Sequence, residues 1–172
     1  MTKILVIEDE PSVRDNLEEI LMLEDFEVVT AANGREGIDA AIANQPDLIL
    51  CDVMMPEVDG YGVIKALRKE VATKNIPFIF LTAKVDRLDQ REGMELGADD
   101  YLTKPFRPSE VIRAIQVRLE RHSNLMQPYH AETERAQTLE KQLENNESLA
   151  EIKENLLTKL TEDLREPLGN VN

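Results

Sequence analysis

Residues 48–60, LILCDVMMPEVDG, run from four apolar residues into an aspartate and then into proline and glycine. The apolar run is too short for a helix and too uniformly hydrophobic for a half-exposed strand, so residues 48–51 are predicted to form a central strand covered on both faces. Asp52 then lies at the carboxyl edge of that strand, where open α/β sheets bind ligands. Asp52 is therefore a candidate nucleophile or metal ligand.

Two further acids are expected at the same edge. Residues 3–7 read as a second buried strand, and Glu8 and Asp9 follow it directly before Pro11 opens a helix. Three bare carboxylates would repel one another and raise each other's pKa, so the arrangement favours a bound divalent cation. Oxygen ligands in this number suit Mg²⁺. The alternative is a set of solvated acids, which are common at helix starts.

Length, composition and charge limit the class of protein. A chain of 172 residues with 42% hydrophobic residues can form one domain with some excess length. The net charge of -14 argues against sequence-independent binding to nucleic acid phosphates and against binding to an anionic membrane surface. No apolar run resembles a secretory signal or a membrane span, so a cytoplasmic location is expected. Cys51 alone allows no internal disulfide, and His122 and His130 lack zinc spacing.

Up to about residue 121, short β-rich runs alternate with amphipathic helical runs, which predicts βαβ units around a parallel sheet. Helices are expected between the strands, and the fifth helix begins at Pro108. The expected strands lie near residues 3–7, 27–30, 48–51, 77–81 and 100–102.

Two more polar residues follow the later strands. Thr82 ends the fourth strand, where its hydroxyl can donate to an anionic oxygen, and Ala83 leaves that oxygen room. Lys104 follows the fifth strand and presents a cation at the same edge as the acids. Pro105 comes next, and a cis bond there would hold the lysine in a tight turn, although the sequence does not show the isomer.

Four motifs together resemble the receiver domain of two-component response regulators: EDEP at residues 8–11, CDVMMPEVDG at 51–60, LTA at 81–83 and GADDYLTKPF at 97–106. The resemblance covers residues 2 to about 121. It implies a flavodoxin-like, five-stranded parallel sheet in the order 2-1-3-4-5, with helices on both faces.

The resemblance also implies roles for individual residues. Asp52 would accept a phosphoryl group from the phosphohistidine of a histidine kinase. Asp9, Asp52 and the backbone carbonyl of Met54 would bind Mg²⁺ directly, and Glu8 would reach it through water. Thr82 and Lys104 would bind the phosphate, and Tyr101 would turn with Thr82 as a switch that changes the face of the fourth and fifth helices. For Tyr101, the alternative is an ordinary half-buried strand aromatic.

The alternative to this interpretation is a different class, the magnesium-dependent phosphatases with an aspartate nucleophile. Those enzymes carry a second aspartate two residues after the nucleophile as general acid, and here that residue is Met54. We therefore expect a phosphoaccepting signalling domain and not an enzyme acting on an external substrate, with self-dephosphorylation at most.

Beyond residue 121 the composition shifts to Glu, Leu, Lys, Gln and Asn, which predicts a linker at 122–135 and a long helical segment at 136–172. The expected heptad a positions are Ala136, Leu143, Ala150, Leu157 and Leu164, and the d positions are Leu139, Asn146, Lys153, Leu160 and Pro167. Leu149, Ile152 and Leu156 widen the apolar stripe, which suits a helical bundle better than a two-stranded coiled coil. A single solvated helix is the alternative.

The end of this tail resembles the dimerisation helix of histidine kinases, but with Glu162 in place of the phosphoacceptor histidine. The matching residues after it are Asp163, Leu164, Arg165, Pro167 and Leu168. We expect no kinase activity from this segment.

The sequence thus predicts a phosphoacceptor response regulator that changes protein–protein interactions through a helical tail and forms a homodimer by it. Because the 51 residues after the receiver contain no basic recognition helix, no DNA binding is expected. Two alternatives remain open: a fragment of a longer receiver and kinase-like hybrid, and an adaptor that docks to a kinase.

Overall fold

The computed structural model of the chain describes residues 1–83 and 87–163, without the side chains of 87–90, 127–130 and 163. Its described part contains one sheet of five parallel strands in the order β2-β1-β3-β4-β5, as predicted. The strands are β1 (Lys3–Ile7), β2 (Glu27–Ala31), β3 (Leu48–Asp52), β4 (Phe78–Thr82) and β5 (Asp100–Thr103).

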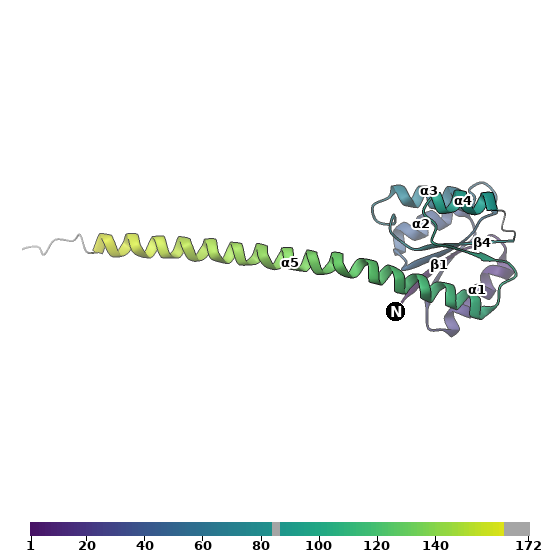
Figure 1. The fold of residues 1–172 in the computed structure, drawn as a ribbon, viewed down its shortest axis with the longest axis horizontal. Helices are drawn as coiled ribbons and strands as arrows, with labels where there is room; N and C mark the ends of the chain where they lie inside the picture. The colour runs from purple at the N-terminus through teal and green to yellow at the C-terminus, as the bar shows by residue number, and fades with distance from the viewer. Residues whose placement is uncertain (84–86, 164–172) are drawn as a thin grey trace, which may run out of the picture. The chain divides into compact units, whose positions relative to one another are not determined.

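Helices cover both faces of this sheet. They are α1 (Pro11–Leu23), α2 (Gly34–Asn44), α3 (Gly60–Lys69), α4 (Arg87–Glu95) and α5 (Pro108–Asp163). Figure 1 shows α1 and the first part of α5 on one face, and α2, α3 and α4 on the other. Local signals start several of them: Pro11 occupies the first turn of α1, and the Asn33 side chain accepts a hydrogen bond from the backbone N–H of Glu36 at the start of α2.

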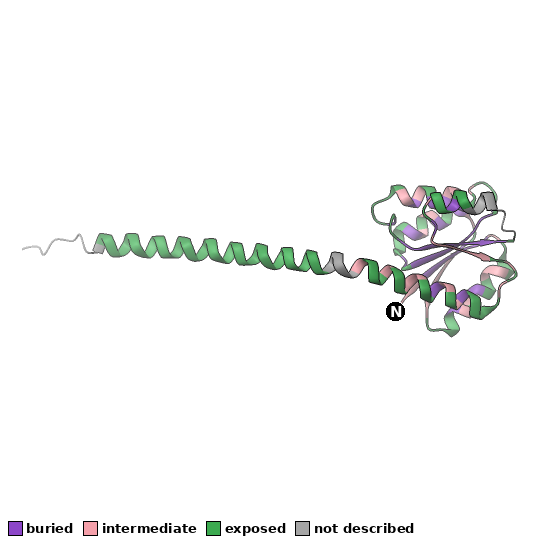
Figure 2. Cartoon of the chain, viewed as in Figure 1, coloured by how far each residue is buried: buried purple, intermediate pink, exposed green. Residues whose placement is uncertain are grey.

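Each face of the sheet has its own hydrophobic core, because neighbouring side chains of a strand point to opposite faces. Leu5 and Ile49 belong to the core under α2 and α3, whereas Ile4 and Leu50 belong to the core under α1 and α5. Every residue of β3 and β4 is buried, as the purple central strands in Figure 2 show. Burial on both faces explains why these strands read as continuous apolar runs.

The chain divides into two compact units, residues 1–123 and 124–172. Helix α5 extends through residues 122–135, where the sequence led us to expect a linker. This segment contains no glycine and many good helix formers, so its single Pro128 was a weak reason to end the helix there. Among the described residues, no helix combines the length and apolar character needed to cross a membrane.

The second unit is helical over its described residues, and every residue from 131 to 162 is exposed (green in Figure 2). The predicted stripe is therefore open in this single chain: Leu139, Leu143, Leu149, Ile152, Leu156, Leu157 and Leu160 are each more than half exposed. Residues 164–172, which include Leu164, Arg165, Pro167 and Leu168 of the kinase-like motif, lie outside the described residues.

Candidate functional site

Three acids meet at the carboxyl edge of the sheet. Glu8 and Asp9 follow β1, Asp52 ends β3, and one carboxylate oxygen of each lies within 4.8 Å of the others. Glu8 is fully buried and Asp52 is only 6% exposed, whereas Asp9 is half-buried. The register Ile7↔Cys51 places the two strand ends level with each other, which is why residues far apart in sequence converge. The predicted acid cluster is thus present.

Lys104 is the cation of this cluster. Its ammonium nitrogen lies 2.7 Å from Oε2 of Glu8 and 3.3 Å from Oδ1 of Asp52. The backbone N–H of Lys104 donates to the carbonyl of Thr82 over 2.7 Å, so the chain leaving β5 stays attached to the end of β4. The Lys104–Pro105 peptide bond is cis.

Burial and mutual charge shift the pKa values of these groups. Desolvation raises the pKa of both Asp52 and Glu8, and the charge of Lys104 opposes the rise at each. The pKa of Lys104 is itself raised: burial acts to lower it, but the hydrogen bond that Lys104 donates to Glu8 and the charges of Glu8 and Asp52 together outweigh that effect. The site therefore holds two carboxylates that protonate more readily than usual and one ammonium that stays charged.

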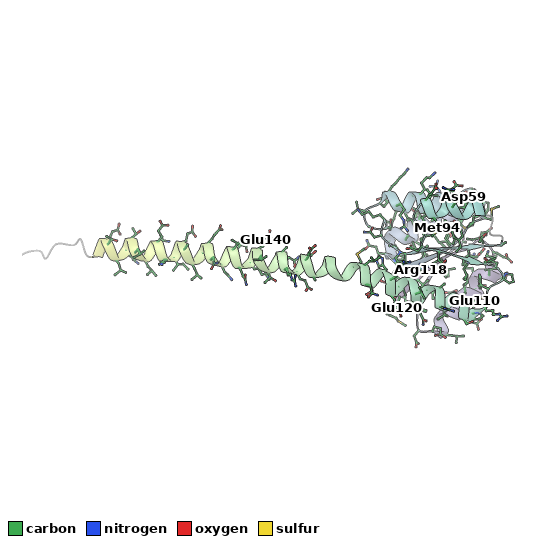
Figure 3. All side chains as sticks on the ribbon, in the orientation of Figure 1. Asp59, Met94, Glu110, Arg118, Glu120 and Glu140 are labelled. Atoms are coloured by element: carbon green, nitrogen blue, oxygen red, sulfur yellow. The ribbon has the colours of Figure 1, made fainter. Side chains whose placement is uncertain are left out.

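The loop after β3 is fitted closely around Asp52. The backbone N–H of Met54 donates to the Asp52 carboxylate, while the Met54 side chain is exposed. Asp59, labelled in Figure 3, caps α3 by accepting a hydrogen bond from the Gly62 N–H over 2.8 Å. A Cβ on Gly60 would lie 2.5 Å from the carbonyl oxygen of Asp52, so only glycine allows α3 to begin this close to the strand end.

Thr82 and Tyr101 lie on the α3–α4 face of the sheet. Thr82 is 6% exposed at the end of β4. The Tyr101 ring packs on the fully buried Phe80, with ring centroids 5.1 Å apart and an interplanar angle of 31°. The sequence predicted that Thr82 and Tyr101 lie at the ends of neighbouring strands. In this structure the Tyr101 ring already packs on Phe80 of β4.

The principal partner of Glu8 is Lys104, a contact that was not predicted from the sequence. The Oε2 atom of Glu8 accepts from Lys104, and its Oε1 accepts from the backbone N–H of Glu10 over 3.1 Å. The predicted contact of Glu8 with a metal through water stays a prediction. A further hydrogen bond, from Arg14 to the Glu8 carbonyl over 2.8 Å, fixes the turn between β1 and α1. The acid and the lysine are 96 residues apart, so no local pattern reveals their contact.

This fold, with acids and one lysine at the carboxyl edge of its sheet, is that of a receiver domain. The sequence profile of the "Response regulator receiver domain" family matches residues 4–116, and the chain belongs to this family. A "Probable transcriptional regulator ycf27" from Cyanophora paradoxa is 49% identical over 122 residues, which cover 71% of this chain and 50% of that protein. The chain thus spans about half the length of the curated relatives that it matches.

Solved structures show the same architecture. The chemotaxis protein CheY4 of Vibrio cholerae superposes with a TM-score of 0.67 at 34% identity, over 69% of this chain and 98% of that one. The receiver domain of the sensor histidine kinase PA1611 from Pseudomonas aeruginosa superposes with a TM-score of 0.65 at 30% identity, over 69% of this chain and 98% of that one. The latter structure holds a magnesium ion in its active site cleft.

The comparisons correct one expectation. We expected no DNA binding because the chain is acidic and its tail lacks a basic recognition helix, and this exclusion was wrong. The name of the Cyanophora relative assigns that protein to transcriptional regulation, and the match covers only half of it. The net charge of -14 describes these 172 residues alone, so it cannot exclude an output that another part of a protein performs.

Proposed function

We propose that this receiver accepts a phosphoryl group on Asp52 from the phosphohistidine of a histidine kinase and passes the change to its helical tail. The observation that supports it most strongly is a nearly buried aspartate within 4.8 Å of two further acids and 3.3 Å from a lysine. A carboxylate with this arrangement can act as a nucleophile toward an anionic phosphoryl group because a fixed cation lies beside it.

The transfer itself needs positioning and charge neutralisation more than covalent assistance. An Asp52 carboxylate oxygen would form the new bond to phosphorus while the bond from phosphorus to the donor imidazole nitrogen breaks. The imidazole leaves with the bonding electron pair and takes up a proton. Lys104 would cover the negative phosphoryl oxygens, and the Thr82 hydroxyl would donate to one of them.

The donor set also fits Mg²⁺, because three carboxylates converge and no nitrogen or sulfur ligand lies in the described cluster. Asp9, Asp52 and the Met54 carbonyl would hold the ion. Both Glu8 oxygens already accept hydrogen bonds, which suits contact through water. Bound Mg²⁺ would neutralise charge on the phosphoryl oxygens. Because Met54 stands where phosphatases carry a general acid, we propose no turnover of an external substrate.

Intact-mass spectrometry after incubation with Mg²⁺ and a small acyl phosphate tests the proposal. The parent chain should gain one phosphate, and a chelator should suppress the gain. Asp52→Asn should remain unlabelled. Asp59→Asn is the matched control: this exposed carboxylate is close in sequence, asparagine caps a helix equally well, and labelling should persist. Full labelling of Asp52→Asn would show that the site assignment is wrong.

The tail is proposed as the segment that carries the signal to a protein partner, because its apolar stripe is exposed in the single chain. Hydrogen exchange of the whole chain tests the coupling. Phosphorylation should change the protection of amides between residues 131 and 162 in the parent and leave them unchanged in Asp52→Asn. Equal protection with and without phosphate in the parent would contradict this role.

A transcriptional output is the second candidate, and the name of the Cyanophora relative favours it. Immunoprecipitation of DNA cross-linked to the chain in cells tests it with the parent and Asp52→Asn. Recovery of particular DNA regions that depends on Asp52 would support this output. Equal recovery from both proteins would contradict a phosphorylation-dependent one.

A further inference from the structure

Gly93 lies in the last turn of α4, although glycine is a poorer helix former than alanine. Its backbone is helical, not left-handed, so the conformation of the chain does not require glycine there. It is nevertheless buried between exposed neighbours, Glu92 and Met94. Figure 3 labels Met94 on the same helix. The reason for a glycine at this position must therefore be space.

The space is filled by the Tyr101 ring. A Cβ built on Gly93 would overlap the hydroxyl oxygen of Tyr101 and lie 2.8 Å from its Cζ, well inside van der Waals contact. The same Cβ would lie 3.0 Å from Cε2 of Phe80. The tyrosine thus occupies the volume that any other side chain at residue 93 would need.

Phe80 forms the other side of this space and cannot easily give way. It is fully buried, and its ring contacts three aromatic neighbours, Tyr61, Phe78 and Tyr101, at centroid distances of 5.2, 5.0 and 5.1 Å. Phe80 pairs with Tyr101 across β4 and β5, two residues before Thr82 in its strand. The ring of Tyr101 is therefore held between a fixed strand and the bare backbone of α4.

We infer that Gly93 is a positioning residue that seats the Tyr101 ring against α4, so that the orientation of the ring and the placement of α4 are coupled. The Tyr101 ring can leave the space between Phe80 and α4 by rotation of its own side chain. Gly93 has no side chain to rotate, and Phe80 is enclosed by its aromatic neighbours. A methyl group at residue 93 should thus drive the ring toward solvent and hold it there. The functional half of this inference rests on the proposed switch through Thr82 and Tyr101.

Tyrosine fluorescence tests the position of the Tyr101 ring against α4 in the unphosphorylated chain. The full chain has no tryptophan and three tyrosines, so Tyr61→Phe with Tyr129→Phe leaves Tyr101 as the sole reporter. In this background, Gly93→Ala should raise the acrylamide quenching constant toward that of free N-acetyltyrosinamide. Met94→Ala is the matched control on the next residue of the helix, and it should leave quenching at the parent value. Equal quenching in Gly93→Ala and the parent would overturn the inference.

A double-mutant cycle adds an independent readout. Gly93→Ala should lower the denaturation midpoint of the parent. In a Tyr101→Ala background it should raise the midpoint, because the ring is gone and alanine favours the helix. This reversal of sign keeps the test valid even if Gly93→Ala alone does not fold. The same shift in both backgrounds would overturn the inference.

Phosphorylation then tests the functional half. Gly93 lies outside the acid cluster, so the Gly93→Ala chain should gain one phosphate as the parent does. Phosphate should change Tyr101 quenching in the parent but not in Gly93→Ala, and an equal change in both would overturn the coupling. If the parent gains no phosphate, only the proposed function is overturned. The quenching measurement and the double-mutant cycle test the position of the Tyr101 ring in the unphosphorylated chain.

Discussion

At the scale of single residues, the contact between Lys104 and Glu8 decides how the site holds its charge. Glu8 is fully buried, and Lys104 is its one cationic partner among the described ion pairs. The same ammonium also reaches Asp52 at 3.3 Å. One lysine thus compensates two carboxylates and opposes the rise that burial causes in the pKa of Asp52.

Lys104→Met should lower the free energy of unfolding by about 2 kcal/mol, because it leaves the buried carboxylate of Glu8 without the positive charge of its partner. We place the figure below that for a fully buried pair since the lysine side chain is 20% exposed. Urea denaturation in the presence of a chelator measures it. Lys65→Met, an exposed lysine on α3, should change the stability little. A cost no larger than that control's would contradict the role of Lys104.

Asp52→Asn should stabilise the metal-free domain near neutral pH, by on the order of 1 kcal/mol. Asp52 has a folded-state pKa above its ordinary value of 3.8, so the folded state binds its proton more readily than the unfolded state does. Ionisation of Asp52 therefore costs stability above the raised pKa, and this cost disappears as the pH falls toward the ordinary value.

Denaturation of the parent and Asp52→Asn at neutral pH and near pH 4 checks the sign. The advantage of the asparagine variant should be present at neutral pH and shrink on acidification. Added Mg²⁺ should stabilise the parent more than the variant, because the proposed ion site of the folded chain includes Asp52. A variant less stable than the metal-free parent at neutral pH would contradict this account.

At the scale of elements, the site depends on how closely the helices approach the ends of the strands. Gly60 lets α3 begin against Asp52, since a Cβ there would lie 2.5 Å from the Asp52 carbonyl oxygen and 2.9 Å from Cε1 of Phe80. Gly62, two residues later, has more room, because its Cβ would find its nearest atom at 3.1 Å.

Gly60→Ala should therefore cost about 2 kcal/mol of stability and slow the labelling of Asp52, because the start of α3 must move away from β3. Gly62→Ala, in the same turn of the same helix, should cost clearly less and label normally. Chemical denaturation and the rate of phosphate uptake measure both effects. Equal costs for the two substitutions would argue against the close approach at Gly60.

The elements also show how far the sequence could predict this structure. Continuous apolar runs such as residues 48–51 predicted where the buried strands lie. Pro11 and Pro108 correctly predicted the starts of two helices. The meeting of Glu8, Asp9 and Asp52 followed from the rule that parallel strands share a carboxyl edge. The contacts of Lys104 with Glu8 and of Gly93 with Tyr101 did not follow, because both depend on side-chain packing between elements.

At the scale of the whole molecule, the two hydrophobic cores belong to one of the two units. The members of both hydrophobic cores lie between Ile4 and Leu119, all within the unit of residues 1–123. A chain of residues 1–123 should therefore unfold within about 0.5 kcal/mol of the full chain and accept phosphate at the same rate. Denaturation and intact-mass measurements on both chains check this. A receiver that unfolds or loses labelling without residues 124–172 would contradict the division.

The most direct test of the central claim is to locate the phosphate. An aspartyl phosphate is an acyl phosphate, and borohydride reduces it to homoserine, which marks the residue permanently. After incubation of the chain with a phosphorylated histidine kinase and Mg²⁺, reduction and peptide mass spectrometry should find homoserine at residue 52 and aspartate unchanged at residues 9 and 59. Homoserine at another residue, or none after the kinase has lost its phosphate to the chain, would contradict the account.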